Sequence, residues 1–149
     1  MPGVSLRLAG TRPDIAAEQG GTLAAQLRRR RRELDLTRAE AAKRIGVSYK
    51  TLMWWELGER SPAVHLYPAV IEYLGSEPWP EPTTLAGALL AERRRRGLGV
   101  NEAAPMIGVD EGTWLRWERG EWKPTARTLP RLDGLFGFLT AVRFPDDVR

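Results

Sequence analysis

Cysteine is absent from this chain of 149 residues, and histidine occurs once, as His65. Without thiols the protein can form neither disulfides nor thiolate metal sites, and one histidine cannot assemble a histidine-rich site. The apolar runs are also far shorter than the ~20 residues that a membrane-spanning helix needs, and no segment resembles a signal peptide. We therefore expect no metal, no cofactor and no membrane association, and we expect the protein to be cytoplasmic.

What the chain does contain is an internal repeat. Residues 22–75 align with residues 84–137 without a gap, and about two positions in five are identical. The segment 40–47 returns at 102–109 with the shared pattern Glu-Ala-Ala-x-x-Ile-Gly-Val. Such a period indicates one structural unit that is built twice. The expected parts are an N-terminal tail over 1–21, repeat 1 over 22–75, a Pro-rich linker over 76–83, repeat 2 over 84–137 and a C-terminal tail over 138–149.

Positive charge is concentrated in the repeats. Residues 22–75 hold ten Lys and Arg against six Asp and Glu, a net charge of +4, and residues 84–137 hold nine against seven, a net charge of +2. With a pI near 9.9, this distribution is typical of a protein that binds a polyanion. An Arg-rich genome would produce the same composition, so charge alone leaves both explanations open.

Each repeat has the spacing of short amphipathic helices. In repeat 1, Thr22, Thr37 and Ser48 can each cap a helix, Glu40 completes a capping box after Thr37, and Gly46 supplies the left-handed residue of a tight turn. We therefore predict an all-α protein with four to five short helices in each repeat. The residues expected to face inward are Leu23, Leu27, Leu34, Ala41, Ala42, Ile45, Leu52, Trp55 and, in a last helix that begins near Tyr67, Val70, Ile71 and Leu74.

Two short helices joined by a glycine turn are typical of the helix-turn-helix, whose second helix enters the major groove of DNA. The segments 36–48 and 55–62 resemble the Cro/repressor (Xre) helix-turn-helix family, and the resemblance covers both repeats. It implies two tandem lambda-repressor-like domains. It also implies sequence-specific binding of double-stranded DNA by a nucleoid-associated transcriptional regulator that acts by occupying its operator.

The outward positions of the third helix are those that read base edges in this family. Lys50 can donate to guanine, Tyr49 can bond a base or a phosphate, and Met53 can meet a thymine methyl group. A solvated face, or one that packs on the other repeat, is the alternative, and the role of Trp54 stays open between DNA, a second protomer and repeat 2. The expected DNA-contacting residues are Arg38, Ser48, Tyr49, Lys50, Met53, Trp54 and Arg116, with Arg38 and Ser48 directed to phosphate.

The resemblance also implies two structural ion pairs. In phage repressors of this family, an Arg on the first helix pairs with a Glu near the end of the recognition helix. The matching residues here are Arg31 with Glu56, and Arg93 with Glu118. The fork of the guanidinium suits a bidentate contact to a carboxylate, which would fix one helix on the other.

Repeat 2 departs from repeat 1 at the positions expected to touch DNA. Asp110, Glu111 and Gly112 stand where repeat 1 has Ser48, Tyr49 and Lys50. Two carboxylates at that place would be repelled by phosphates, although Asp110 can cap a helix and Glu111 can accept from a cytosine amino group. Repeat 2 is therefore either a weaker or differently specific reader, or a module for dimerisation or for docking another protein.

Further departures and the connecting segments complete the expectations. Val100 replaces Arg38, and Pro105 should distort the second helix of repeat 2 unless that helix starts late. The prolines of 76–83 should make the linker stiff, with anchoring of Trp79 on one repeat as the alternative. Residues 138–149 are expected to finish the last helix and then fray, and Val4–Leu8 could be an edge strand.

An enzyme is not expected. The sequence shows no nucleophile–base pair, no metal-ligand cluster and no phosphate-binding loop. Asp110 and Glu111 form an adjacent acidic pair, but their place at a helix start favours capping. The remaining alternative is a protein-interaction adaptor, antitoxin-like or phage-encoded, in which repeat 2 binds protein rather than DNA.

Overall fold

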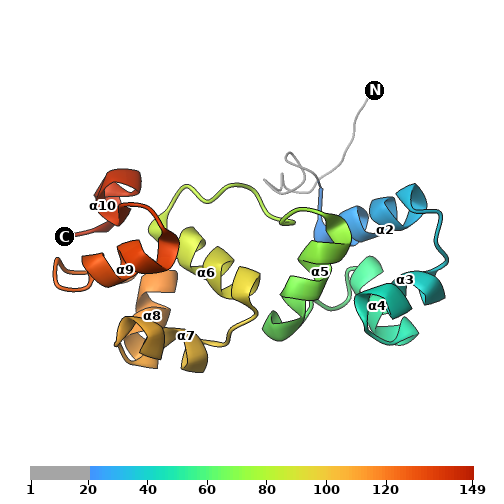
Figure 1. Ribbon diagram of the computed structural model, residues 1–149, viewed down its shortest axis with the longest axis horizontal. Helices are drawn as coiled ribbons and strands as arrows, with labels where there is room; N and C mark the ends of the chain where they lie inside the picture. The colour runs from blue at the N-terminus through green and yellow to red at the C-terminus, as the bar shows by residue number, and fades with distance from the viewer. Residues whose placement is uncertain (1–20) are drawn as a thin grey trace. The chain divides into compact units, whose positions relative to one another are not determined.

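The computed structural model describes residues 21–149, and that part of the chain is helical without strands (Figure 1). The alternation at Val4–Leu8 lies outside the described residues. Two compact units are present: one holds the described residues up to Pro62 and Ala69–Pro80, and the other holds Ala63–Pro68 and Glu81–Arg149. The prediction of an all-α chain with two tandem helix-turn-helix units is confirmed.

The α-helices of the two repeats have nearly matching boundaries. Those of repeat 1 are α2 (Leu23–Glu33), α3 (Arg38–Ile45), α4 (Tyr49–Glu56), the 3₁₀ turn η1 (Val64–Leu66) and α5 (Tyr67–Leu74). Those of repeat 2 and the segment after it are α6 (Leu85–Arg96), α7 (Val100–Ile107), α8 (Glu111–Glu118), α9 (Leu129–Phe136), α10 (Thr140–Arg143) and η2 (Pro145–Asp147). Within each unit the helix after the glycine turn, α4 or α8, packs against the two helices that precede it (Figure 1).

The helix starts of repeat 1 follow the predicted caps. The Thr22 hydroxyl accepts from the Ala25 amide at 3.1 Å, and the Ser48 hydroxyl accepts from the Thr51 amide at 3.1 Å. Thr37 and Glu40 form the predicted capping box, in which the Thr37 amide donates to Glu40 Oε1 at 2.8 Å. These bonds satisfy amides that the first helical turn leaves without a partner, and so they set where each helix begins.

Between α3 and α4 the chain turns at Gly46, which has a φ of +97°. A side chain would strain this left-handed conformation, so glycine permits the tight turn.

The core of repeat 1 is close to the predicted set. Most of the expected positions are buried, and Leu27 and Leu52 are completely so, which stabilises the fold by about 2 kcal/mol for each leucine. The exceptions are half-buried, because single short helices leave the edges of their apolar stripes exposed to solvent. They are Leu23, Leu34, Ile71 and Leu74.

Pro105 lies inside α7 without delaying the start of that helix. The helix begins at Val100, where the matching α3 begins at Arg38, and both end at an isoleucine followed by a left-handed glycine. Proline removes only the hydrogen bond to the carbonyl of Asn101. Asn101 and Pro105 are both exposed, so water can reach that carbonyl.

The C-terminal segment does not fray, contrary to expectation. Gly137 ends α9, and α10 and η2 then fold back onto repeat 2, with Phe144 only 4% exposed. Phe138 stacks on Phe136 with 4.8 Å between ring centroids, and the Asp147 carboxylate accepts from the Leu85 amide at 3.0 Å. The apolar character of this segment supplies the packing, and the carboxylate occupies the start of α6, where anions are favoured.

The first half of the linker belongs to repeat 1. Pro78 is buried, and its carbonyl accepts from Gln26 Nε2 at 3.2 Å. The indole nitrogen of Trp79 donates to Glu77 at 3.0 Å, and the Trp79 ring is half-buried. The chain thus stays attached to repeat 1 for several residues beyond the end of α5.

Candidate nucleic-acid interface

The outer face of α4 carries the residues that the sequence singles out. Leu52 and Trp55 are buried, whereas Tyr49 is 50% exposed, Lys50 is exposed and Met53 is half-buried. Ser48 is exposed at the start of the helix, and its hydroxyl is used in the cap. A helix with an apolar inner face and a polar, aromatic outer face after a glycine turn has the form of a recognition helix.

A buried carboxylate fixes α4 in place. Glu56, at the end of α4, is 0% exposed and forms a bidentate pair with Arg31 of α2, with Nε to Oε2 at 2.9 Å and Nη2 to Oε1 at 3.1 Å. Arg28 donates to the Glu56 main-chain carbonyl. A carboxylate taken out of water needs several partners to offset its lost hydration, and here these partners join α2 to α4.

Arg38 is a further partner of Glu56, although the sequence had suggested a phosphate contact for it. Its Nε lies 2.9 Å from Glu56 Oε1, and its Nη1 lies 3.4 Å from the Tyr49 hydroxyl. The hydrogen bond to Glu56, and next the one to Tyr49, raise the pKa of the Arg38 guanidinium above its usual range. Arg38 therefore ties α3 to both ends of α4 and holds the exposed Tyr49 ring.

The Trp54 ring makes cation–π contacts with two positive side chains, which the sequence analysis did not predict. The guanidinium of Arg60 lies 3.7 Å from the Trp54 ring centroid, and Lys50 Nζ lies 5.7 Å from it. The ring is half-buried, so it forms a platform beside two positive charges. Repeat 2 offers the sequence signal for this stack: Arg116 matches Trp54, and Trp122 matches Arg60.

The arginine run of α2 is largely used inside the protein. In addition to Arg28 and Arg31, Arg30 donates its Nε to the Tyr73 carbonyl at 2.8 Å. Arg29 and Arg32 are exposed. Only part of the run can therefore face a polyanion.

Repeat 2 holds the matching Glu118, which is half-buried, by a different set of donors. Arg93 makes the bidentate contact to Glu118, with Nε to Oε2 at 2.5 Å and Nη2 to Oε1 at 3.0 Å. Val100 stands at the place of Arg38, and its side chain has no hydrogen-bond donor. The indole N–H of Trp114, which matches Leu52, donates to Glu118 Oε2 at 2.5 Å instead.

The start of α8 is acidic, as its sequence requires. Asp110 caps the helix by accepting from the Thr113 amide at 2.7 Å, and Glu111 is exposed. Hydrogen bonds from Thr113 hold the pKa of the Asp110 carboxyl below its usual range, and the nearby charge of Arg116 contributes. Arg116 lies over the Trp122 ring, 4.5 Å from its centroid.

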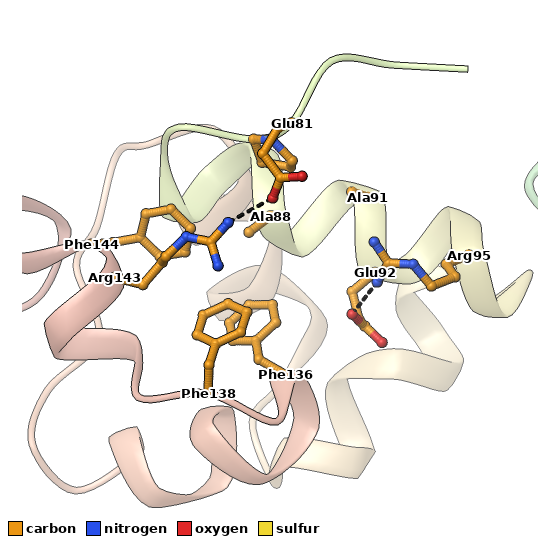
Figure 2. Close-up of a pocket in the computed structure, with 10 residues that line it drawn as sticks. Glu81, Ala88, Ala91, Glu92, Arg95, Phe136, Phe138, Arg143 and Phe144 are labelled. Atoms are coloured by element: carbon orange, nitrogen blue, oxygen red, sulfur yellow. Dashed lines mark hydrogen bonds and ion pairs between the residues drawn. The ribbon is translucent and has the colours of Figure 1, made fainter. Parts of the chain in front are cut away.

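A cavity beside α10 is too small for a typical ligand. Figure 2 shows a cavity between three phenylalanines and the Arg143–Glu81 ion pair, in which Arg143 Nη2 lies 2.6 Å from Glu81 Oε2. Its volume is about 50 Å³, whereas ligand pockets typically measure ~300 Å³ or more. Within residues 21–149, no group of three or more His, Cys, Asp or Glu side chains could hold a metal ion, and no helix has the length and apolar character to cross a membrane.

Comparison with known families agrees with this geometry. A family model described as a helix-turn-helix domain matches the chain twice, over residues 22–78 and residues 85–143. The chain therefore belongs to this helix-turn-helix family, and both repeats are members of it. Neither the curated proteins nor the solved structures gave a match. Membership suggests DNA as a partner and a regulatory role.

Proposed function

We propose that this protein binds double-stranded DNA sequence-specifically and regulates transcription in the cytoplasm by occupying an operator, in the manner of the Cro/repressor family. The observation that carries the proposal is the outer face of α4, where Tyr49, Lys50 and the Trp54 platform are presented by a helix anchored through Glu56. Anchoring matters because base readout requires the reading side chains to be placed in advance.

Recognition divides between positioning and reading. Lys50 donates to guanine O6 and N7, Tyr49 bonds a base or a phosphate, and Met53 contacts a thymine methyl group. Phosphates are met by exposed cations and by the amides at the start of α4 beside Ser48. Arg38 acts chiefly through Tyr49 and Glu56, which it holds. Once bound at a promoter, the protein would act by steric exclusion, a mechanism that requires neither catalysis nor a cofactor.

A second candidate function is a protein-interaction adaptor, and a specific feature favours it. Leu139 is 62% exposed at the start of α10, and Val142 is 74% exposed within this helix. Exposed apolar side chains near one another are typical of a docking surface for a protein or a second copy of the chain. In this function, repeat 2 would bind protein and the chain would show little preference among DNA sequences.

Selection from random duplex DNA, with the whole chain at near-physiological salt, separates the two functions. We expect enrichment of a defined element. Lys50→Ala should lower affinity for that element by roughly 5- to 150-fold and relax one base position, because one base contact is worth about 1–3 kcal/mol. The matched control is Lys43→Ala, which removes an exposed lysine of α3 and should leave the preferred sequence unchanged. If no element is enriched, the adaptor function is favoured and the regulator is rejected.

A further inference from the structure

We propose that repeat 2 is a second DNA reader, in which Arg116 rather than the residue matching Lys50 donates to guanine in the major groove. This inference rests on the proposed function and deepens it, since it assigns a reading residue and a base to repeat 2. Three features of the structure support it. They are an arginine–tryptophan contact whose two residue types are exchanged between the repeats, the absence of a side chain at Gly112, and the available N–H donors of Arg116.

The exchanged pair joins the recognition helix to the loop that follows it. In repeat 1 the helix carries the ring of Trp54 and the loop carries the guanidinium of Arg60, at 3.7 Å from the ring centroid. In repeat 2 the helix carries Arg116 and the loop carries the ring of Trp122, at 4.5 Å. Both residue types are reversed while the contact is kept. The exchange therefore moves a guanidinium from the loop onto the recognition helix.

The vacant Cβ position is at Gly112. A Cβ built on this glycine would lie 2.9 Å from Arg116 Nη1. The guanidinium thus occupies the space beside Gly112, the second residue of α8. In repeat 1 the matching position is that of Lys50. Repeat 2 lacks this lysine, but the side chain of Arg116, one turn later in α8, places a cation at the same end of the helix. Arg116 also offsets the charge of Asp110, whose pKa it helps to lower.

The donors of Arg116 are available to a ligand. The Trp122 ring holds the flat face of the guanidinium, and no acceptor among residues 21–149 takes up the N–H groups at its edge. Stacking restricts the rotamers of a long side chain without using its hydrogen bonds, which lowers the entropy cost of binding. A guanidinium presented in this way matches the O6 and N7 atoms of guanine with two parallel hydrogen bonds. Glu111, exposed one turn earlier, can accept from the amino group of a cytosine.

The test uses the whole chain and selection from random duplex DNA, followed by affinity measurements on the enriched elements. We expect two different elements, one lost on Lys50→Ala and the other carrying a guanine that depends on Arg116. Arg116→Lys keeps the charge but removes the fork. Arg116→Ala should lower affinity for the second element by roughly 5- to 150-fold and abolish its guanine preference, whereas Arg116→Lys, which can still donate to guanine as Lys50 does, should only weaken that preference.

Two positioning variants distinguish a reading role from a structural one. Gly112→Ala should displace the guanidinium and weaken the guanine preference, while its melting temperature should not fall, because alanine suits a helix better than glycine. Trp122→Leu removes the ring and should weaken the guanine preference, whereas Trp122→Phe keeps a ring and should retain much of it. Arg127→Lys alters another exposed arginine of repeat 2 and is the control for a general effect of charge.

Each failure is distinguishable. If an element that depends on Lys50 is enriched but no guanine depends on Arg116, this inference is rejected and the proposed function stands. A loss of affinity that is equal for all sequences would place Arg116 on phosphate, which also rejects it. If no element is enriched, both the proposed function and the inference fail.

Discussion

The two repeats have nearly the same α-helix boundaries but stabilise the recognition helix differently. In repeat 1 the buried Glu56 receives hydrogen bonds from Arg31 and Arg38, and in repeat 2 Glu118 receives them from Arg93 and from the indole of Trp114. The carboxylate and its bidentate arginine are common to both. The second donor comes from a different helix in each repeat, which teaches that the unit requires a satisfied carboxylate rather than one particular neighbour.

The surfaces differ more than the cores. The start of α4 presents Ser48, Tyr49 and Lys50, whereas the start of α8 is acidic and has a glycine at the place of the lysine. Side chains that pack inward are limited by volume, but outward side chains are limited only by what they bind. The two units are thus built alike and are expected to select different partners or different base sequences.

The largest effect is expected from removing the shared carboxylate. Glu56→Ala would leave Arg31 and Arg38 without their acceptor, and it should lower the free energy of unfolding by about 3 kcal/mol. Denaturant unfolding followed by tryptophan fluorescence measures this. Glu59→Ala, an exposed glutamate of the same repeat, should change stability by less than about 0.5 kcal/mol. Equal effects of the two substitutions would show that the ion pair does not anchor α4.

An intermediate effect is expected from exchanging the second donor. Arg38→Val gives repeat 1 the residue of repeat 2 and should cost about 1–2 kcal/mol, because one hydrogen bond to a charged acceptor is lost at a partly exposed site. Leu52→Trp supplies the indole donor of repeat 2. In a double-mutant cycle the pair should be coupled favourably by at least about 0.5 kcal/mol. Additive costs would mean that the indole cannot replace the guanidinium in repeat 1.

The smallest effect concerns the caps of the two recognition helices and depends on pH. The pKa of Asp110 is lowered in the folded state, so its contribution to stability is present above the ordinary pKa near 4 and is lost as pH falls through the lower, folded value. The Ser48 hydroxyl does not titrate in this range. The amide resonance of Thr113 should therefore shift in acid while that of Thr51 stays constant, as measured by NMR. A similar acid shift at both amides would show that the caps are not the source of the difference.

The fold was predictable because its signals are local. Thr22, Thr37 and Ser48 mark helix starts, Gly46 marks the turn, and the offset between the repeats carries each assignment from one unit to the other. Pro105 was harder to assess, since its cost depends on whether the carbonyl one turn earlier reaches water.

The details of the candidate site were less predictable because they depend on side chains that meet across the fold. Arg38 lies on α3 and Glu56 at the end of α4, and no periodicity indicates that their side chains meet. The platform of Arg60 on Trp54 depends on a loop conformation. The comparison of the repeats was the only available signal for it, since each residue changes type where its partner does.

The hydrogen bonds made by the last residues of the chain limit where the second unit can be truncated. The sequence repeat ends at Gly137, but Asp147 accepts from the Leu85 amide, and the Arg149 amide donates to the Pro124 carbonyl at 3.1 Å. These bonds join the last residues of the chain to the first turn of α6 and to the loop after α8. The folded second unit is therefore longer than the sequence repeat. Truncation of the chain after Gly137 would remove the hydrogen bond that holds the start of α6.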